Sequence, residues 1–160
     1  MNLAAERDRI RKLLQRGEVA MLVTFDGGKA HSGRPMLPLW LRKDPHIYFL
    51  THRDSRKVAQ IGVRPQVALT VVSGGCYLVV LGLAYASRDP ALIRRLWHPT
   101  YRAWFPGGAG DREAIVLQVV INKVNYWEPP RGRVRRLFQA VKAVATRRSI
   151  ETPMRTIEPW

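Results

Sequence analysis

The most informative segment of this chain is Ile47-Tyr48-Phe49-Leu50-Thr51-His52-Arg53-Asp54-Ser55-Arg56-Lys57-Val58-Ala59-Gln60-Ile61. An apolar run ends at Thr51, a polar loop follows, and Ser55 or the preceding Asp54 is the expected N-cap of a helix. The N–H groups of the helix start, the hydroxyls of Thr51 and Ser55, and the charges of Arg56 and Lys57 are groups that together bind a phosphate. The pattern is equally typical of a strand–loop–helix corner with a solvated basic face, so the segment alone leaves both interpretations open.

In its order of residues, this segment resembles the phosphate-binding segment of the pyridoxamine 5′-phosphate oxidase-like flavoproteins, and most of all their general stress protein branch. The resemblance runs from about Leu14 to Trp127 and includes, in the family order, Ser32-Gly33-Arg34-Pro35-Met36, the segment above, Trp97 through Gly108, and Tyr126-Trp127. It implies an antiparallel split β-barrel with flanking helices, mainly β and of the α+β class, paired as a homodimer. It also implies an FMN-dependent oxidoreductase, or a flavin-binding protein, whose substrate is unassigned.

The resemblance places ten residues at the cofactor: Arg34, Pro35, Met36, Thr51, Ser55, Arg56, Lys57, Trp104, Phe105 and Trp127. The basic residues and Ser55 are expected at the phosphate, Thr51 at the phosphate or the ribityl chain, and the Pro35-Met36 backbone beside the flavin ring. Trp104 or Phe105 is expected to arrive from the partner subunit, whereas Trp127 is also explained as a core or interface aromatic. Residues 109–113 depart from the Asp-Pro pair usual in the family, so no substrate-binding residue is transferred.

The composition favours one globular domain. The chain has 160 residues, of which 46% are hydrophobic, enough to bury a substantial core. No apolar run approaches the roughly 20 residues of a membrane helix, and no signal peptide is readable at the N-terminus. The single cysteine, Cys76, has no internal disulfide partner. These features predict a cytoplasmic location.

The charge is unevenly distributed. The formal net charge is +15, and seven basic residues but no acidic ones lie between Arg131 and Arg148. We therefore expect a flavin-binding barrel over residues 1–128 and a basic, partly helical extension over 129–160. Apolar residues recur in the extension at spacings of three and four, which is typical of an amphipathic helix. Such a helix either packs on the barrel or binds weakly to a polyanion such as nucleic acid or an anionic membrane.

The remaining pattern predicts many short strands and a few helices. An amphipathic helix is expected over residues 3–15, and strands over 19–25, 30–36, 37–41, 46–51, 66–72, 77–86 and 114–120. The run 19–25 is continuously apolar and predicts a strand buried on both faces or nearly so. Pro35 indicates a sheet edge, bulge or break, and Gly82 a bulge or bend. Ser87 or Asp89 is expected to cap a helix over residues 90–96.

Several functions are disfavoured by missing motifs. The four histidines are scattered, no metal site is expected, and neither a nucleophile elbow nor a glycine-rich nucleotide loop is present. No catalytic residue is assigned, so any chemistry would belong to a bound cofactor. One alternative is a reductase of the same fold that uses the deazaflavin F420. A lower-ranked one is haem binding through His52 or His98, and a third is a non-catalytic module that binds through the basic extension.

Overall fold

The computed structural model of the chain describes residues 3–28, 31–128 and 154–160. Three α-helices are present in this part of the chain: α1 (Leu3–Arg16), α2 (Arg56–Val63) and α3 (Pro90–Leu96). Two 3₁₀ helices follow α3, η1 (Pro99–Ala103) and η2 (Gly108–Gly110). The strands are β1 (Ala20–Phe25), β2 (His31–Met36), β3 (Ile47–His52), β4 (Gln66–Ser73), β5 (Cys76–Ser87), β6 (Ala114–Trp127) and β7 (Met154–Ile157). None of the described helices is both long and apolar enough to span a membrane.

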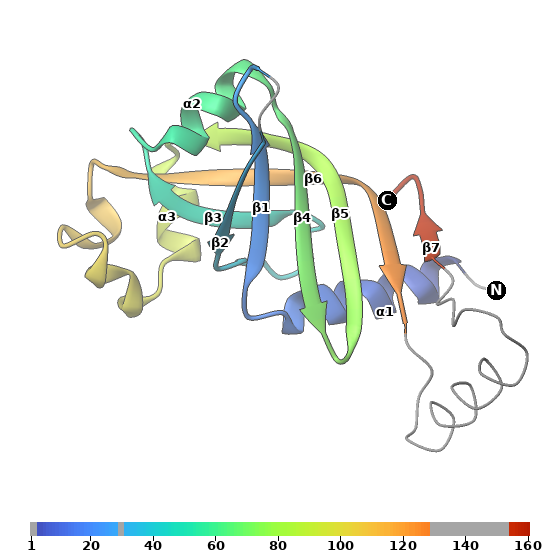
Figure 1. The fold of residues 1–160 in the computed structure, drawn as a ribbon. Helices are drawn as coiled ribbons and strands as arrows, with labels where there is room; N and C mark the ends of the chain where they lie inside the picture. Colours follow the sequence, from blue (N-terminus) through green and yellow to red (C-terminus); the bar gives the residue numbers. More distant parts are fainter. Residues whose placement is uncertain (1–2, 29–30, 129–153) are drawn as a thin grey trace, which may run out of the picture.

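All strand pairs are antiparallel, in the order β2-β1-β4-β5-β6-β3, and β7 pairs with the distal part of β6 (Figure 1). A single bridge between Leu39 and Tyr48 joins the segment after β2 to β3. Since β2 and β3 lie at opposite ends of the strand order, this bridge brings the two edges of the sheet together. The fold is the antiparallel split barrel of the α+β class that the sequence predicts.

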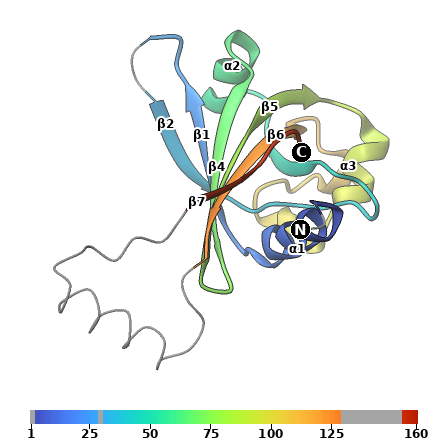
Figure 2. The same cartoon turned by 90° about the vertical axis from the view of Figure 1, so that its right-hand side faces the viewer.

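Two hydrophobic clusters lie on opposite faces of β3. Ile47 and Phe49 point into the barrel core, which α1 covers with Ile10 and Leu14. The other face of β3 forms a second cluster with α3 and η1, made up of Leu41, Tyr48, Leu50, Ile93, Leu96, Tyr101, Phe105, Ala114 and Val116. In Figure 2, α1 and α3 lie on the same side of β4 and β5. Because β3 is covered on both faces, its C-terminal end is held firmly where the polar loop begins.

Several local predictions are confirmed. The first helix is α1, and Pro35 lies in the edge strand β2. The register of β5 against β6 shifts between Leu81 and Gly82, as a bulge requires. Asp89 is the N-cap of α3, and its side chain accepts a hydrogen bond from the backbone N–H of Ala91 at 2.9 Å. The residue types at these turns and caps therefore determine where the elements begin and bend.

Other predictions are corrected by the structure. The apolar run 19–25 is not buried on both faces: Met21 is 41% exposed, and burial alternates along β1 because one face of this strand points outward. Residues 37–41 do not form a strand and make only the bridge at Leu39. The final strand β7 is missing from the predictions, and β6 extends to Trp127. The predicted basic helix over 131–148 lies outside the described residues, and the boundary at residue 128 stays a prediction.

Candidate functional site

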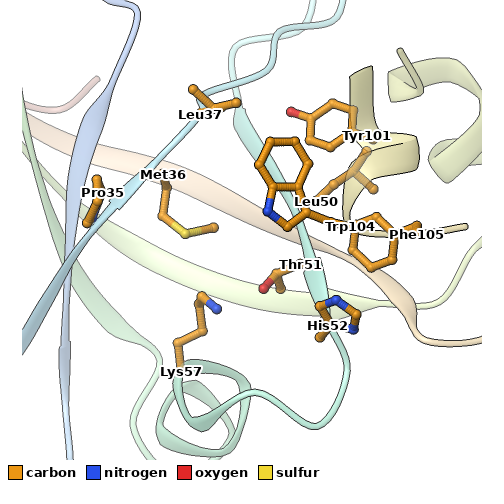
Figure 3. A pocket seen from close by; sticks show the side chains of 10 residues that line it. All are labelled: Pro35, Met36, Leu37, Leu50, Thr51, His52, Lys57, Tyr101, Trp104 and Phe105. Carbon is orange, nitrogen blue, oxygen red and sulfur yellow. The ribbon is translucent and has the colours of Figure 1, made fainter. Parts of the chain in front are cut away.

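A cavity of about 260 Å³ opens where the two edges of the sheet meet (Figure 3). Its walls come from the end of β2, the end of β3, the first turn of α2, and the aromatic segment around η1. The lining residues are Pro35, Met36, Leu37, Leu50, Thr51, His52, Lys57, Tyr101, Trp104 and Phe105. Most of these side chains are apolar, and Thr51, His52 and Lys57 supply polar groups on one side. The cavity thus combines an apolar slot with a polar, cationic end.

Six of the ten predicted site residues line this cavity: Pro35, Met36, Thr51, Lys57, Trp104 and Phe105. They come from four separate elements, so the fold brings together residues that are distant in the sequence. Trp104 and Phe105 line the cavity of their own chain, where neither has to arrive from a partner subunit. Arg34, Ser55 and Arg56 do not line the cavity, but they lie on β2 and at the start of α2, next to residues that do.

Three cations lie near one another at the start of α2 and on β2: Lys57, which lines the cavity, and Arg34 and Arg56, which are adjacent in sequence to residues that line it. Burial, together with the positive charge of Arg56, lowers the pKa of Arg34. Burial and the charge of Arg34 lower the pKa of Lys57. Arg34 therefore lies close enough to Arg56 and to Lys57 for their positive charges to repel one another. No carboxylate among the described residues forms an ion pair with Arg34, Arg56 or Lys57. This corner of the molecule therefore carries positive charge that its own side chains do not cancel.

The guanidinium of Arg34 is held by neutral groups. Its Nη1 donates to Thr24 Oγ1 at 2.6 Å, and its Nη2 donates to Gln60 Oε1 at 3.2 Å. The Thr24 hydroxyl in turn donates to Gln60 Oε1 at 2.6 Å. Thr24 and Gln60 are both buried, at 0% and 6% exposed. The hydrogen bonds to Thr24 and Gln60 therefore fix the Arg34 guanidinium without neutralising its charge.

Ser55 occupies the N-cap position of α2 with an extended backbone, but its side chain makes no capping hydrogen bond. Its backbone carbonyl accepts from the N–H groups of Val58 and Ala59, at 2.9 and 3.3 Å. The Ser55 Oγ is buried and has no hydrogen-bond partner in the structure. Buried hydroxyl groups are nearly always hydrogen-bonded, so an unpartnered one next to Lys57 is a candidate partner for a ligand. Of the two N-caps that the sequence leaves open, Asp54 and Ser55, the structure has Ser55.

The wall of the cavity that faces Lys57 is formed by aromatic side chains. Phe105 is buried against His52, with ring centroids 4.6 Å apart, and Tyr101 is buried beside it. Burial raises the pKa of the Tyr101 hydroxyl. Trp104 is 55% exposed and stands at the cavity in Figure 3. A large aromatic ring left half in water offers a flat apolar surface to a planar ligand.

The sequence predicts no flavin contact for Leu37, Leu50, His52 or Tyr101, although all four line the cavity. Leu37 directly follows the predicted Pro35-Met36 pair, and Leu50 and His52 flank Thr51. Tyr101 belongs to the aromatic segment that the resemblance includes. Their position next to predicted site residues is the one feature of the sequence that indicates them as cavity residues. Strand alternation argues against two of them, because it places Leu50 and His52 on the face opposite Thr51.

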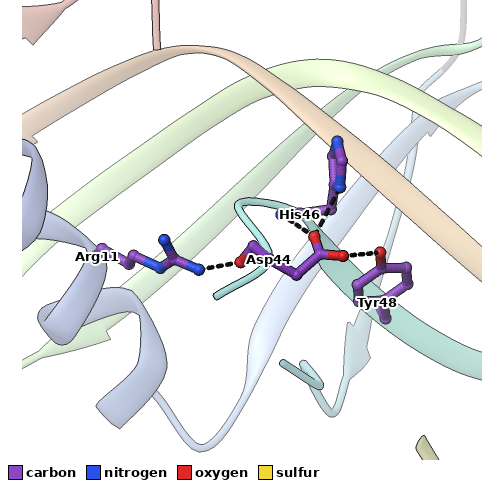
Figure 4. Close-up of polar contacts among 4 residues, drawn as sticks. All are labelled: Arg11, Asp44, His46 and Tyr48. Atoms are coloured by element: carbon purple, nitrogen blue, oxygen red, sulfur yellow. Dashed lines mark hydrogen bonds and ion pairs between the residues drawn. The ribbon is translucent and has the colours of Figure 1, made fainter. Parts of the chain in front are cut away.

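The start of β3 is fixed by a polar network around Asp44 (Figure 4). Arg11 of α1 donates to the Asp44 carbonyl. The Asp44 carboxylate accepts from the backbone N–H of His46 at 2.9 Å and from the Tyr48 hydroxyl at 2.8 Å, and lies 2.7 Å from His46 Nδ1. Partial burial opposes ionisation of Asp44, but these hydrogen bonds outweigh it and lower its pKa. Burial and the bond to Asp44 raise the pKa of Tyr48 to about 12.

Trp127 lies far from the cavity of its own chain. It pairs with Tyr77 across β5 and β6, whereas Thr51 pairs with Ile115 near the other end of β6. Twelve residues of extended strand separate Ile115 from Trp127, a length of about 40 Å along the strand. The Tyr77 side chain beside it is exposed. Trp127 can therefore contact a ligand in such a cavity only if that cavity belongs to another subunit.

Comparisons with known proteins give a consistent result. The family model described as "Pyridoxamine 5'-phosphate oxidase like" matches residues 5–151. The chain is similar in structure to the general stress FMN/FAD binding protein from Xanthomonas citri, with 25% identity, a TM-score of 0.70, and coverage of 81% of this chain and 92% of that one.

Two further solved structures share the fold. General Stress Protein 26 from Bacillus anthracis is 20% identical with a TM-score of 0.69, covering 78% of this chain and 95% of that one. A pyridoxamine 5′-phosphate oxidase-related, FMN binding protein from Nostoc punctiforme is 17% identical with a TM-score of 0.64. The match covers 82% of this chain and 87% of that one. No curated protein matches the chain.

Proposed function

Because the chain belongs to the pyridoxamine 5′-phosphate oxidase-like family, we propose that it binds FMN in the cavity between β2, β3, α2 and η1. We propose further that it is an FMN-dependent oxidoreductase of unassigned substrate. The observation that carries the proposal is the cluster of Arg34, Arg56 and Lys57, which no carboxylate among the described residues neutralises. A phosphate monoester of charge about −1.5 to −2 suits such a cluster.

The residues present fit each part of FMN. The phosphate would be held by the three cations and by the unpartnered Ser55 Oγ at the start of α2. Thr51, whose side chain lies between Lys57 and Trp104 in Figure 3, would serve the ribityl chain. The ring would lie in the apolar slot made by Met36, Leu50 and the aromatic wall. The bound flavin would supply the electron or hydride transfer.

A homodimer forms part of the proposal. The cavity is slightly smaller than the 300–1,000 Å³, roughly, of pockets that enclose a drug-sized ligand, so a flavin would project from it. The half-exposed Trp104 at its edge, and the exposed Met21, Val72 and Tyr77 on the outer sheet face, are apolar surfaces that a second copy could cover. Trp127 of the partner subunit could then reach the cofactor, which its own chain does not allow.

The phosphate assignment is tested by the double variant Ser55→Ala, Lys57→Ala. Removing one cation and the unpartnered hydroxyl should weaken FMN binding by on the order of tenfold or more, without unfolding the barrel. The matched control is Lys12→Ala, which also removes one charge but from an exposed pair with Asp8 on α1. Affinity is measured by flavin fluorescence titration and folding by thermal unfolding. An FMN affinity equal to that of the Lys12 variant would reject the assignment.

A further inference from the structure

Arg34 is held by hydrogen bonds to two buried residues, Thr24 and Gln60. In the β1–β2 register, Arg34 is opposite Leu22, and Thr24 is two residues further along β1 on the same face. Gln60 reaches the same point from α2. The three side chains form a closed set of hydrogen bonds: Arg34 to Thr24, Arg34 to Gln60, and Thr24 to Gln60. Two strands and a helix therefore jointly fix one guanidinium group.

The acceptors in this set are neutral side chains, whereas two other arginines of the described residues pair with carboxylates. Arg9 lies 3.1 Å from the carboxylate of Glu128, and Arg53 lies 3.5 Å from that of Glu113. A glutamate at position 60 would satisfy the same two donors in nearly the same space. It would also pair with Arg34 and cancel one of the three positive charges. A glutamine gives Arg34 a fixed direction and preserves its charge.

The side-chain amide of Gln60 also has an unused hydrogen-bond donor, which suggests a role in ligand binding. Its Oε1 is already used by Thr24 and Arg34, and its Nε2 is buried without a hydrogen-bond partner. The amide cannot turn over to relieve this, because its N–H groups would then face the guanidinium donors. A buried N–H donor beside a cation that lacks a counter-charge is suited to an anionic oxygen.

We infer that Thr24 and Gln60 are positioning residues, which aim Arg34 at the phosphate of the bound flavin while leaving its charge uncancelled. They thereby set the preference of the protein for FMN over riboflavin, the same ring and ribityl chain without the phosphate. The inference rests on the proposed function, since it specifies how the proposed phosphate contact is built.

The test compares FMN with riboflavin in fluorescence titrations of the wild type and four variants. Gln60→Glu keeps the shape but adds a charge, and Gln60→Met removes the acceptor. Thr24→Val removes the hydroxyl at constant volume, and Thr24→Ser restores it. We expect Gln60→Glu to lower the affinity for FMN by on the order of tenfold and to leave that for riboflavin nearly unchanged. Gln60→Met and Thr24→Val should give smaller losses that are again specific to FMN, and Thr24→Ser should retain the preference.

The two ligands separate positioning from simple structural damage. If Gln60→Glu and Thr24→Val weaken FMN and riboflavin in parallel, or leave their ratio unchanged, the inference is overturned. Should Gln60→Glu fail to fold, Thr24→Val against Thr24→Ser decides by the same ratio. A wild-type protein that binds both flavins equally well contradicts the inference and leaves flavin binding intact. A wild-type protein that binds neither contradicts the proposed function itself.

Discussion

Arg34, Arg56 and Lys57 hold three positive charges in one corner of the molecule, a grouping that opposes folding unless an anion is bound. The arginines remain charged at any physiological pH, so loss of a proton from them does not relieve the repulsion, whereas the proposed phosphate would. The sequence already indicated this cluster, because the residue types and their order are sufficient to suggest a phosphate site. It did not indicate Thr24 or Gln60, whose contacts with Arg34 span 10 and 26 residues and depend on the tertiary fold.

At the same scale, Asp44 should give the protein a measurable sensitivity to acid. Its pKa in the folded state is below the ordinary value of 3.8, so ionised Asp44 stabilises the fold at neutral pH. That contribution is complete above the unfolded pKa and is lost as the pH falls through the lower folded pKa. We expect Asp44→Asn to lower the free energy of unfolding by on the order of 1–2 kcal/mol at pH 7.

The difference between Asp44→Asn and the wild type should shrink below about pH 4 as Asp44 becomes protonated. Urea unfolding at several pH values measures it, with Asp8→Asn, a change in a well-exposed pair, as the control. A difference that stays constant down to pH 2 would show that the carboxylate charge is irrelevant to the network.

Among the helices and strands, the sequence predicts correctly those features that depend on residues close together in the chain. Caps, turns and the bulge at Gly82 depend on one or two residues, so they can be read directly. The burial predicted for both faces of the apolar run 19–25 is wrong, because continuous hydrophobicity does not show whether the outer face of a strand is covered. The strand predicted at 37–41 is reduced to one bridge, with Pro38 unable to donate to a ladder. The strand β7 pairs with the far end of β6, a contact with no local signal.

The bulge at Gly82 predicts a loss of stability when this glycine is replaced. A Cβ atom at Gly82 would lie 2.3 Å from the carbonyl oxygen of Val120 on β6. Since the obstacle is backbone, the Gly82→Ala variant must displace β5 from β6, and we expect a loss of about 2 kcal/mol or more. Gly62→Ala is the control, because nothing lies within 4 Å of its Cβ and alanine favours the helix α2 by up to about 1 kcal/mol. Equal midpoints of urea unfolding for the two variants would contradict this account of the bulge.

At the scale of the whole molecule, the proposal requires two copies of the chain. The apolar surfaces at Trp104 and on the outer face of β1, β4 and β5 are exposed in one chain. We expect sedimentation equilibrium to give twice the 18.3 kDa mass of the single chain at micromolar concentration. A strictly monomeric protein that still bound FMN would remove the partner subunit, and with it Trp127, from the site.

We propose that the cavity at the split of the barrel holds FMN by its phosphate. The most direct measurement is an absorption and fluorescence spectrum of the purified protein, taken as isolated and again after incubation with FMN and gel filtration. We predict flavin bands that stay with the protein, with fluorescence altered by binding, and no comparable retention of riboflavin. A colourless protein that releases FMN on the column would contradict the claim, and retention of F420 instead would assign the site to the deazaflavin.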